Sequence, residues 1–242
     1  MKKPYNSVFQ SLNSTFEGYA INAYTKKHRV LNFSPGPSQF PILLFDMLNL
    51  DSFPYGTTPF ELSHRSPEFV EMMHRVNEKV RTFMCIPEDF SILWMPNGAH
   101  GQFSAIPLNL SNIIKEEQCN YVVNGTWSHR ALEEGSKFSN AYNSHSSPLL
   151  PLQMKDIQHE PMIHEKDKYI FLCSNETING LEFRYDGIPY PTRTKLKNTL
   201  SIIDMSSDFG MKNINWYHKD IVFSCSSKNF GIPGTTIVIV RN

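Results

Sequence analysis

A series of short apolar runs, separated by polar segments long enough to form helices, constrains the fold of this chain more than any other feature. Each run is almost continuously apolar, which is typical of strands that are buried on both faces. Such strands, alternating with helix-forming segments, favour a parallel sheet. The sequence therefore predicts an α/β fold, a mainly parallel sheet with helices on both faces. The runs occupy residues 91–95, 121–123, 169–173, 200–203, 221–223 and 237–240.

The segment that begins at Ser66 gives the clearest helix signal. Ser66 suits the N-cap position, Pro67 suits the first turn, and Glu68 supplies an early acidic side chain. After this start, apolar side chains recur at helical spacing, at Phe69, Met72, Met73, Val76, Val80 and Phe83. Further helices are predicted from about residue 101 and after residue 127.

The rest of the chain carries weaker structural signals. Residues 1–31 are polar without a clear period and are predicted to be an N-terminal extension to one large domain at 32–242. A helix is expected around residues 41–50. Residues 144–161 are polar and contain proline, which indicates a surface loop with a short strand.

Composition excludes several classes of protein. The chain of 242 residues is 40% hydrophobic and has 23 basic and 23 acidic side chains, so nothing indicates a nucleic-acid or membrane partner. None of the four cysteines belongs to a CxxC pair, and we expect them to be reduced and buried, with no metal bound. No secretory signal is recognised, so the expected location is cytoplasmic. A basic stretch at residues 22–30 keeps an organellar location as an alternative.

A lysine and an aspartate each lie beyond a predicted strand. Lys228 follows the run at 221–223, and Asp204 ends the run at 200–203. Taken alone, Lys228 reads as a solvated surface charge and Asp204 as a helix cap. Together they match what a pyridoxal phosphate enzyme needs, a lysine that forms a Schiff base and a carboxylate that pairs with the pyridinium nitrogen.

Three other polar segments follow separate predicted strands. A glycine-containing turn at residues 97–102 would let backbone N–H groups approach an anion at a helix start. Trp127 could stack on an aromatic ring, and residues 175–180 could meet a ring hydroxyl. Each segment also has a plainer reading, as a turn or a core tryptophan. Because the carboxyl ends of parallel strands meet at one edge of a sheet, one pocket could hold them all.

Several of these segments resemble motifs of the phosphoserine aminotransferase family, which are class V, fold type I pyridoxal phosphate enzymes. The resemblance runs from about residue 32 to residue 242, and Asn-Glu-Thr-Ile-Asn-Gly and Gly-Gln-Phe are its most specific motifs. It implies a homodimer with pyridoxal 5'-phosphate as cofactor. It also implies amino transfer between glutamate and 3-phosphohydroxypyruvate in serine biosynthesis. The matching segments are residues 33–37, 63–65, 101–103, 175–180 and 228–231.

The resemblance also assigns roles to single residues. Lys228 and Asp204 are the implied catalytic pair, with Lys228 as the covalent anchor and proton carrier. His64, Arg65 and His100 match positions that bind the substrate. The implied cofactor-binding residues are Ala99, His100, Trp127, Thr177, Asp204, Ser227 and Lys228.

Three departures from the family pattern bear on activity. His100 stands where the family usually has arginine, so weaker or pH-dependent phosphate binding is expected. Ser227 replaces a glutamine, and the sequence ends at Asn242, so the family's C-terminal domain is expected to be absent. One alternative is a truncated, non-catalytic relative that binds cofactor or dimerises. Another is an aminotransferase for a non-phosphorylated substrate.

Overall fold

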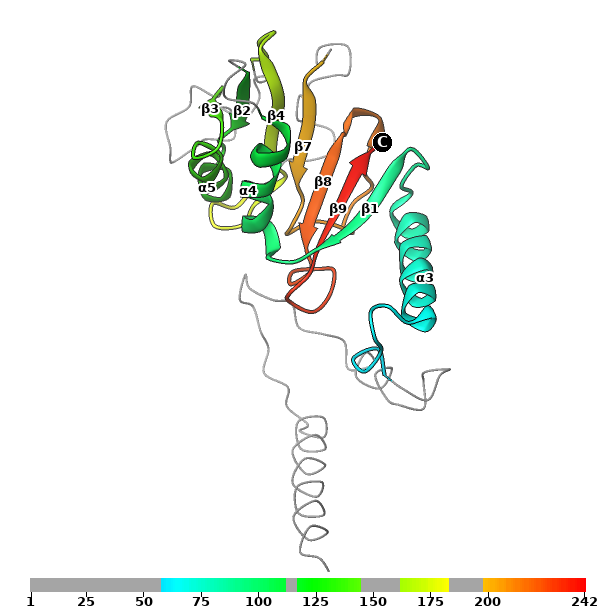
Figure 1. Cartoon of the computed structure of the whole chain (residues 1–242). Coiled ribbons are helices and arrows are strands. Elements are labelled where there is room, and N and C mark those ends of the chain that lie inside the picture. The colour runs from blue at the N-terminus through cyan, green and yellow to red at the C-terminus, as the bar shows by residue number, and fades with distance from the viewer. Residues whose placement is uncertain (1–57, 112–116, 145–161, 183–197) are drawn as a thin grey trace, which may run out of the picture. The chain divides into compact units, whose positions relative to one another are not determined.

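The computed structural model describes residues 58–111, 117–144, 162–182 and 198–242 (Figure 1). The chain divides into two compact units, residues 1–34 with 39–63 and residues 35–38 with 64–242. All elements named below belong to the second unit. Four predicted features lie wholly or almost wholly outside the described residues: the extension at 1–31, the motif at 33–37, the helix at 41–50 and the loop at 144–161.

Among the described residues, seven strands form one sheet in the order β1-β9-β8-β7-β4-β2-β3. The strands β3, β2, β4, β7 and β8 pair in parallel, whereas β9 runs antiparallel to both β8 and β1. The predicted mainly parallel sheet is therefore confirmed. The strand bounds are β1 (Phe90–Met95), β2 (Gln118–Val122), β3 (Asn140–Asn143), β4 (Asp167–Cys173), β7 (Leu200–Asp204), β8 (Ile221–Cys225) and β9 (Thr236–Arg241).

Three strands were not predicted, because none of them is an apolar run. The edge strand β3 has asparagine at both ends. A separate two-stranded hairpin pairs β5 (Asn175–Glu176) with β6 (Leu181–Glu182). The hairpin turn needs a positive φ at Gly180, which is +68°, and this geometry suits glycine.

The helices begin where local capping chemistry places them. Helix α3 (Pro67–Met84) starts as predicted, with the Phe69 amide donating to Ser66 Oγ at 3.2 Å. Helix α4 (Gly98–Leu110) begins earlier than expected, because Asn97 and Gly98 adopt φ values of 77° and 63° and turn the chain directly out of β1. Helix α5 (Thr126–Gly135) follows β2, and a 3-10 turn, η4 (Trp216–His218), precedes β8.

Helices pack on both faces of the sheet, as predicted. Successive strand residues point to opposite faces, so the strands contribute side chains to two apolar cores. The α4 and α5 side is built around Phe103, Tyr121, Ala131, Phe171, Ile202 and Phe223. The α3 side is built around Val80, Met84, Leu172, Ile203, Val222 and Ile239.

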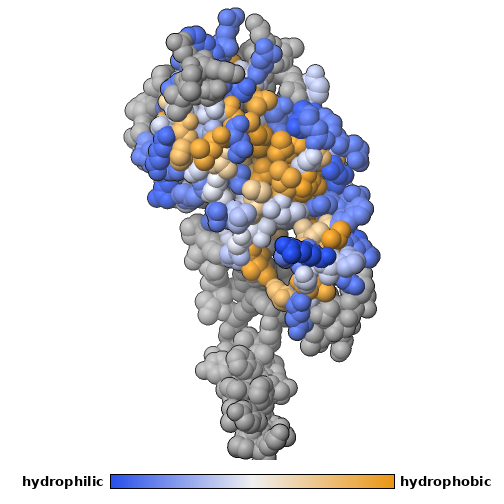
Figure 2. All heavy atoms as spheres, viewed as in Figure 1, coloured by the Kyte–Doolittle hydropathy of each residue, from blue (hydrophilic) through white to orange (hydrophobic). Residues whose placement is uncertain are grey.

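The edge strand β1 carries exposed apolar side chains. Figure 2 shows hydrophobic surface over the middle of the face that carries α4 in Figure 1. Leu93 and Met95 of β1 are partly exposed, whereas the intervening Trp94 packs into the α3-side core. This alternation follows from the two-residue period of a strand.

The described cysteines are all free thiols, which agrees with the expected reduced state. Burial holds for Cys119 and Cys173 only. Cys85 is exposed at the C-cap of α3, where its own backbone is in the left-handed conformation, and Cys225 is half-buried. Within the described residues, no helix is both long enough and apolar enough to cross a membrane.

Candidate active site

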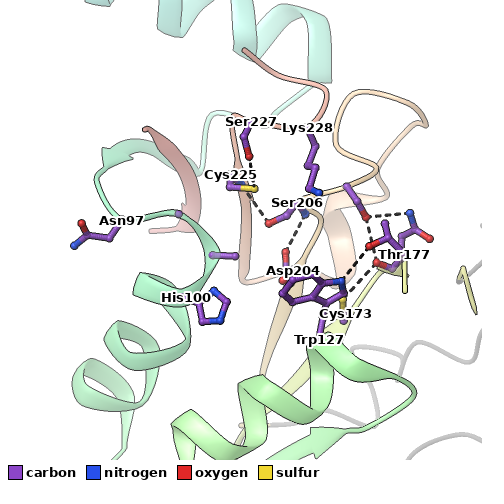
Figure 3. Close-up of a pocket in the computed structure, with 14 residues that line it drawn as sticks. Asn97, His100, Trp127, Cys173, Thr177, Asp204, Ser206, Cys225, Ser227 and Lys228 are labelled. Carbon is purple, nitrogen blue, oxygen red and sulfur yellow. Dashed lines mark hydrogen bonds between the residues drawn. The ribbon is translucent and has the colours of Figure 1, made fainter. Parts of the chain in front are cut away.

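The loops beyond β4, β7 and β8 and the first turns of α4 and α5 surround a cavity of about 250 Å³ (Figure 3). These strands are parallel, so their carboxyl ends meet at the same edge of the sheet. The structure therefore brings together every residue that the sequence nominated for cofactor binding. Those residues are Ala99, His100, Trp127, Thr177, Asp204, Ser227 and Lys228.

Lys228 lies in a turn that directly follows β8. The turn is closed by the Ser226 carbonyl, which accepts from the amides of Phe230 at 3.2 Å and Gly231 at 2.7 Å. The Phe230 ring is held between two other rings, stacked on Trp94 at 5.9 Å and edge-on to Phe209 at 5.2 Å. The turn is thus fixed from both sides, and Figure 3 shows the Lys228 side chain pointing into the cavity.

Asp204 ends β7 as a buried acid, only 4% exposed. Its Oδ1 accepts from the Ser206 amide at 2.9 Å. Burial raises the pKa of Asp204 to about 6, against the opposing effect of the Ser206 hydrogen bonds, and the nearby carboxylates of Asp208 and Glu176 add to the rise. An ionised carboxylate in such a place is stabilised by a cationic partner.

The start of α4 opens onto the cavity. Asn97 makes no side-chain cap within the described residues, so the first backbone N–H groups of the helix need another acceptor. Ala99 and His100, in this first turn, both line the cavity. Uncapped N–H groups and the helix dipole together favour an anion such as a phosphate.

Trp127, the second residue of α5, contributes an aromatic wall. Its Nε1 donates to Thr177 Oγ1 at 3.0 Å, so Thr177 keeps its own hydroxyl proton for another acceptor. The Arg130 guanidinium lies 5.1 Å from the indole centroid, and the His100 ring is edge-on to the indole at 6.2 Å. The indole can stack on a planar ligand, as the sequence predicted.

Some lining residues were not singled out from the sequence. Ser206 lies two residues after Asp204, so the rule that located Asp204 could also have found it. Its hydroxyl accepts from the Cys225 amide at 3.2 Å and joins the loops after β7 and β8. The other lining residues that lie outside the segments assigned to the pocket from the sequence are Cys173, Ser207 and Cys225.

His64 and Arg65, which the sequence assigned to substrate binding, lie outside the Lys228 cavity. His64 borders a separate, open cavity of about 460 Å³ that includes Phe69 and Met73 of α3 and Ile92 of β1. Neither His64 nor Arg65 is among the described residues that line the Lys228 cavity. Their substrate-binding role stays a prediction.

Comparison with known proteins agrees with this geometry. The family model of class-V aminotransferases matches residues 30–242. The chain belongs to the class-V aminotransferase family. The predicted α/β fold of this family is confirmed by solved structures, including phosphoserine aminotransferase from Bacillus circulans subsp. alkalophilus, with a TM-score of 0.75 and 26% identity, covering 88% of this chain and 57% of that one.

Within the family, the similar proteins include phosphoserine aminotransferases. A probable phosphoserine aminotransferase of Caenorhabditis elegans is 35% identical over 218 residues, covering 88% of this chain and 56% of the relative. Phosphoserine aminotransferase 1, chloroplastic, of Arabidopsis thaliana is 31% identical, covering 93% of this chain and 51% of the relative. The structure of the enzyme from Trichomonas vaginalis, bound to its cofactor, has a TM-score of 0.72 and 31% identity, covering 88% of this chain and 58% of that one. The chain thus spans little more than half the length of the relatives it matches.

Proposed function

We propose that this chain binds pyridoxal 5'-phosphate and acts as a phosphoserine aminotransferase, moving an amino group between glutamate and 3-phosphohydroxypyruvate in serine biosynthesis. The observation that carries the proposal is the convergence of Lys228, Asp204, Trp127 and Thr177 on one cavity. An uncapped helix start on the same cavity supports it, because the cofactor carries a phosphate.

The residues of the cavity fit the cofactor group by group. Asp204 would face the ring nitrogen and keep it protonated. Thr177 would donate its free hydroxyl proton to the ring oxygen, and the Trp127 indole would stack on the ring. Backbone N–H groups at Ala99 and His100, together with the Ser227 hydroxyl, would hold the phosphate; Ser227 Oγ lies 3.5 Å from Cys225 Sγ.

The chemistry of amino transfer follows from that arrangement. When bound, pyridoxal phosphate supplies an electron sink for negative charge that develops at a substrate carbon. Lys228 Nζ would anchor the cofactor covalently and would serve as the base and acid that carries a proton from the substrate Cα to the cofactor. The fixed turn around Phe230 would keep Nζ within reach of the reacting carbon. The Asp204 carboxylate would keep a proton on the ring nitrogen.

A coupled assay with glutamate and 3-phosphohydroxypyruvate tests the proposal. Wild type is expected to transfer the amino group, and Lys228→Ala should lose at least about 10²-fold in rate, because it lacks the proton carrier. Transfer no faster than in Lys228→Ala would contradict the enzymatic proposal and leave a protein that binds cofactor or dimerises. Replacing the acceptor by hydroxypyruvate tests the non-phosphorylated substrate, which would then be used better than its phosphorylated counterpart.

The domain boundaries, the homodimer and the cytoplasmic location stay predictions from the sequence. In a homodimer, His64 and Arg65 of one chain could serve the cavity of the other. Neither residue lines the cavity of its own chain, which is consistent with such an arrangement. The assay above, repeated with Arg65→Ala, should then show a raised KM for the phosphorylated acceptor.

A further inference from the structure

The first turn of α5 is held by the β5–β6 turn instead of by its own N-cap. The N-cap is a glycine without a side chain, so the first N–H groups of the helix need acceptors from elsewhere. The Thr126 amide donates to Asn179 Oδ1 at 2.7 Å. The amides of Trp127 and Ser128 donate to the two oxygens of Glu176, at 2.8 Å and 2.7 Å. All three N–H groups of this turn are therefore paired by one neighbouring segment.

The Glu176 side chain acts here as an acceptor only. It is fully buried, and its Oε1 also receives the Ser128 hydroxyl at 2.6 Å. The amides of Asn124 and Gly125 donate to that same hydroxyl, so its single proton is available for the carboxylate. Three donors and a helix N-terminus suit a negative carboxylate. A glutamine side chain at this position would instead place its NH₂ group against a backbone N–H.

The helix and the hairpin approach each other too closely for any side chain at position 125. A Cβ added to Gly125 would lie 2.5 Å from Glu176 Cδ and 2.7 Å from Asn179 Oδ1. Through this contact Trp127 is tied twice, by its amide to Glu176 and by its indole to Thr177. The orientation of the indole therefore depends on Glu176 and Thr177, which are adjacent in the sequence at the hairpin.

We propose that Glu176 is a positioning residue of this site, whose buried carboxylate caps α5 and so fixes the Trp127 indole as a wall of the cavity. It does not line the cavity and acts through Trp127. The N-termini of α4 and α5 differ in how their first N–H groups are paired. The start of α4 is open to an incoming anion, whereas the start of α5 is closed by an anion of the chain itself. The effect on cofactor binding rests on the proposed function, but the fixing of the indole does not.

The test compares Glu176→Gln with Asp167→Asn, a matched change at another buried acid. Asp167 is 4% exposed and accepts from the His164 amide at 2.8 Å and from Asn120 Nδ2 at 3.1 Å, away from the cavity. Acrylamide quenching of Trp127 fluorescence, obtained by difference from Trp127→Phe, reports the indole without any cofactor. Titration with pyridoxal phosphate gives its Kd.

Glu176→Gln is expected to raise the Trp127 quenching constant several-fold and the Kd about tenfold, since one N–H of the turn loses its acceptor. Asp167→Asn should lower stability to urea and leave both values unchanged. Equal quenching and equal Kd in Glu176→Gln and wild type would overturn the proposal. If Glu176→Gln does not fold, Glu176→Asp keeps the charge and withdraws the carboxylate from the amides of Trp127 and Ser128, and an unchanged quenching constant in that variant would overturn the proposal.

The positioning role of Glu176 and the proposed function can fail separately. Should wild type not bind pyridoxal phosphate at all, the proposed function fails. The quenching comparison still decides the role of Glu176, because it needs no cofactor. Raised quenching in Glu176→Gln without any cofactor binding in wild type would support the positioning role alone.

Discussion

At the scale of single residues, Asp204 carries an electrostatic penalty that a cofactor would relieve. Its pKa is raised from 3.8 to about 6 by burial, so between these values the folded chain holds more protons than the unfolded chain. Stability of the unliganded chain contributed by this group is therefore present below about pH 4 and is lost as the pH rises to about 6. The penalty at neutral pH is roughly 3 kcal/mol, at about 1.4 kcal/mol for each pKa unit.

Replacing this acid tests the sign of the effect. We expect Asp204→Asn to match wild type in urea stability near pH 4 and to exceed it by roughly 2–3 kcal/mol at pH 7.5, without cofactor. The same variant should bind pyridoxal phosphate more weakly than wild type. A stability difference that does not change between the two pH values would contradict this reading of Asp204.

His100 is the residue where a single exchange should improve activity. Arginine binds phosphate through two parallel hydrogen bonds and is always charged, so His100→Arg is expected to lower the KM for 3-phosphohydroxypyruvate several-fold. The matched control is His129→Arg on the outer part of α5, where the new side chain keeps a contact with Glu133 and should leave the KM unchanged. An equal KM in wild type and His100→Arg would show that position 100 does not meet the substrate phosphate.

At the scale of elements, the close approach of α5 to the β5–β6 hairpin depends on Gly125. We expect Gly125→Ala to lower the free energy of unfolding by about 1–3 kcal/mol, because the new methyl group overlaps Glu176. Gly231→Ala is the control, since the nearest atom to its added Cβ is 3.9 Å away. Urea denaturation of both variants is the measurement. Equal stability of the two variants would show that the hairpin can move away from α5.

The elements also show what could be predicted from local sequence. The start of α3 follows from Ser66 and Pro67, because capping is a local effect. The hairpin was not predicted, because β5 and β6 are only two residues long each and are stabilised by α5, which is remote in sequence. The cap on α5 was missed for the same reason, since Glu176 lies far along the chain from Trp127.

At the scale of the whole molecule, one sheet supports two independent cores. Neighbouring residues Ile202 and Ile203 of β7 are fully buried but pack on opposite faces. We expect Ile202→Val and Ile203→Val each to lower the free energy of unfolding by about 0.5–1.5 kcal/mol. The double variant should equal the sum to within about 0.5 kcal/mol, because the two side chains share no partner in the cores. A larger coupling in urea denaturation would mean that the faces are not independent.

The apolar runs made the sheet predictable, because a strand buried on both faces leaves little choice of residue type. The same logic located the cavity, since it needs only the rule that parallel strands end together. The antiparallel direction of β9 carries no signal in its composition, because its four buried residues look like those of any central strand. Strand direction is set by the connections between strands, which residue types do not encode.

The proposed function requires that the cavity holds pyridoxal phosphate through Lys228. The most direct test is to add one equivalent of pyridoxal phosphate to the intact chain, reduce with borohydride and map the labelled peptide by mass spectrometry. We predict a single label on Lys228 at near-stoichiometric yield, and a much lower yield in Asp204→Asn. A label spread over several exposed lysines, with Lys228 unmodified, would contradict the account.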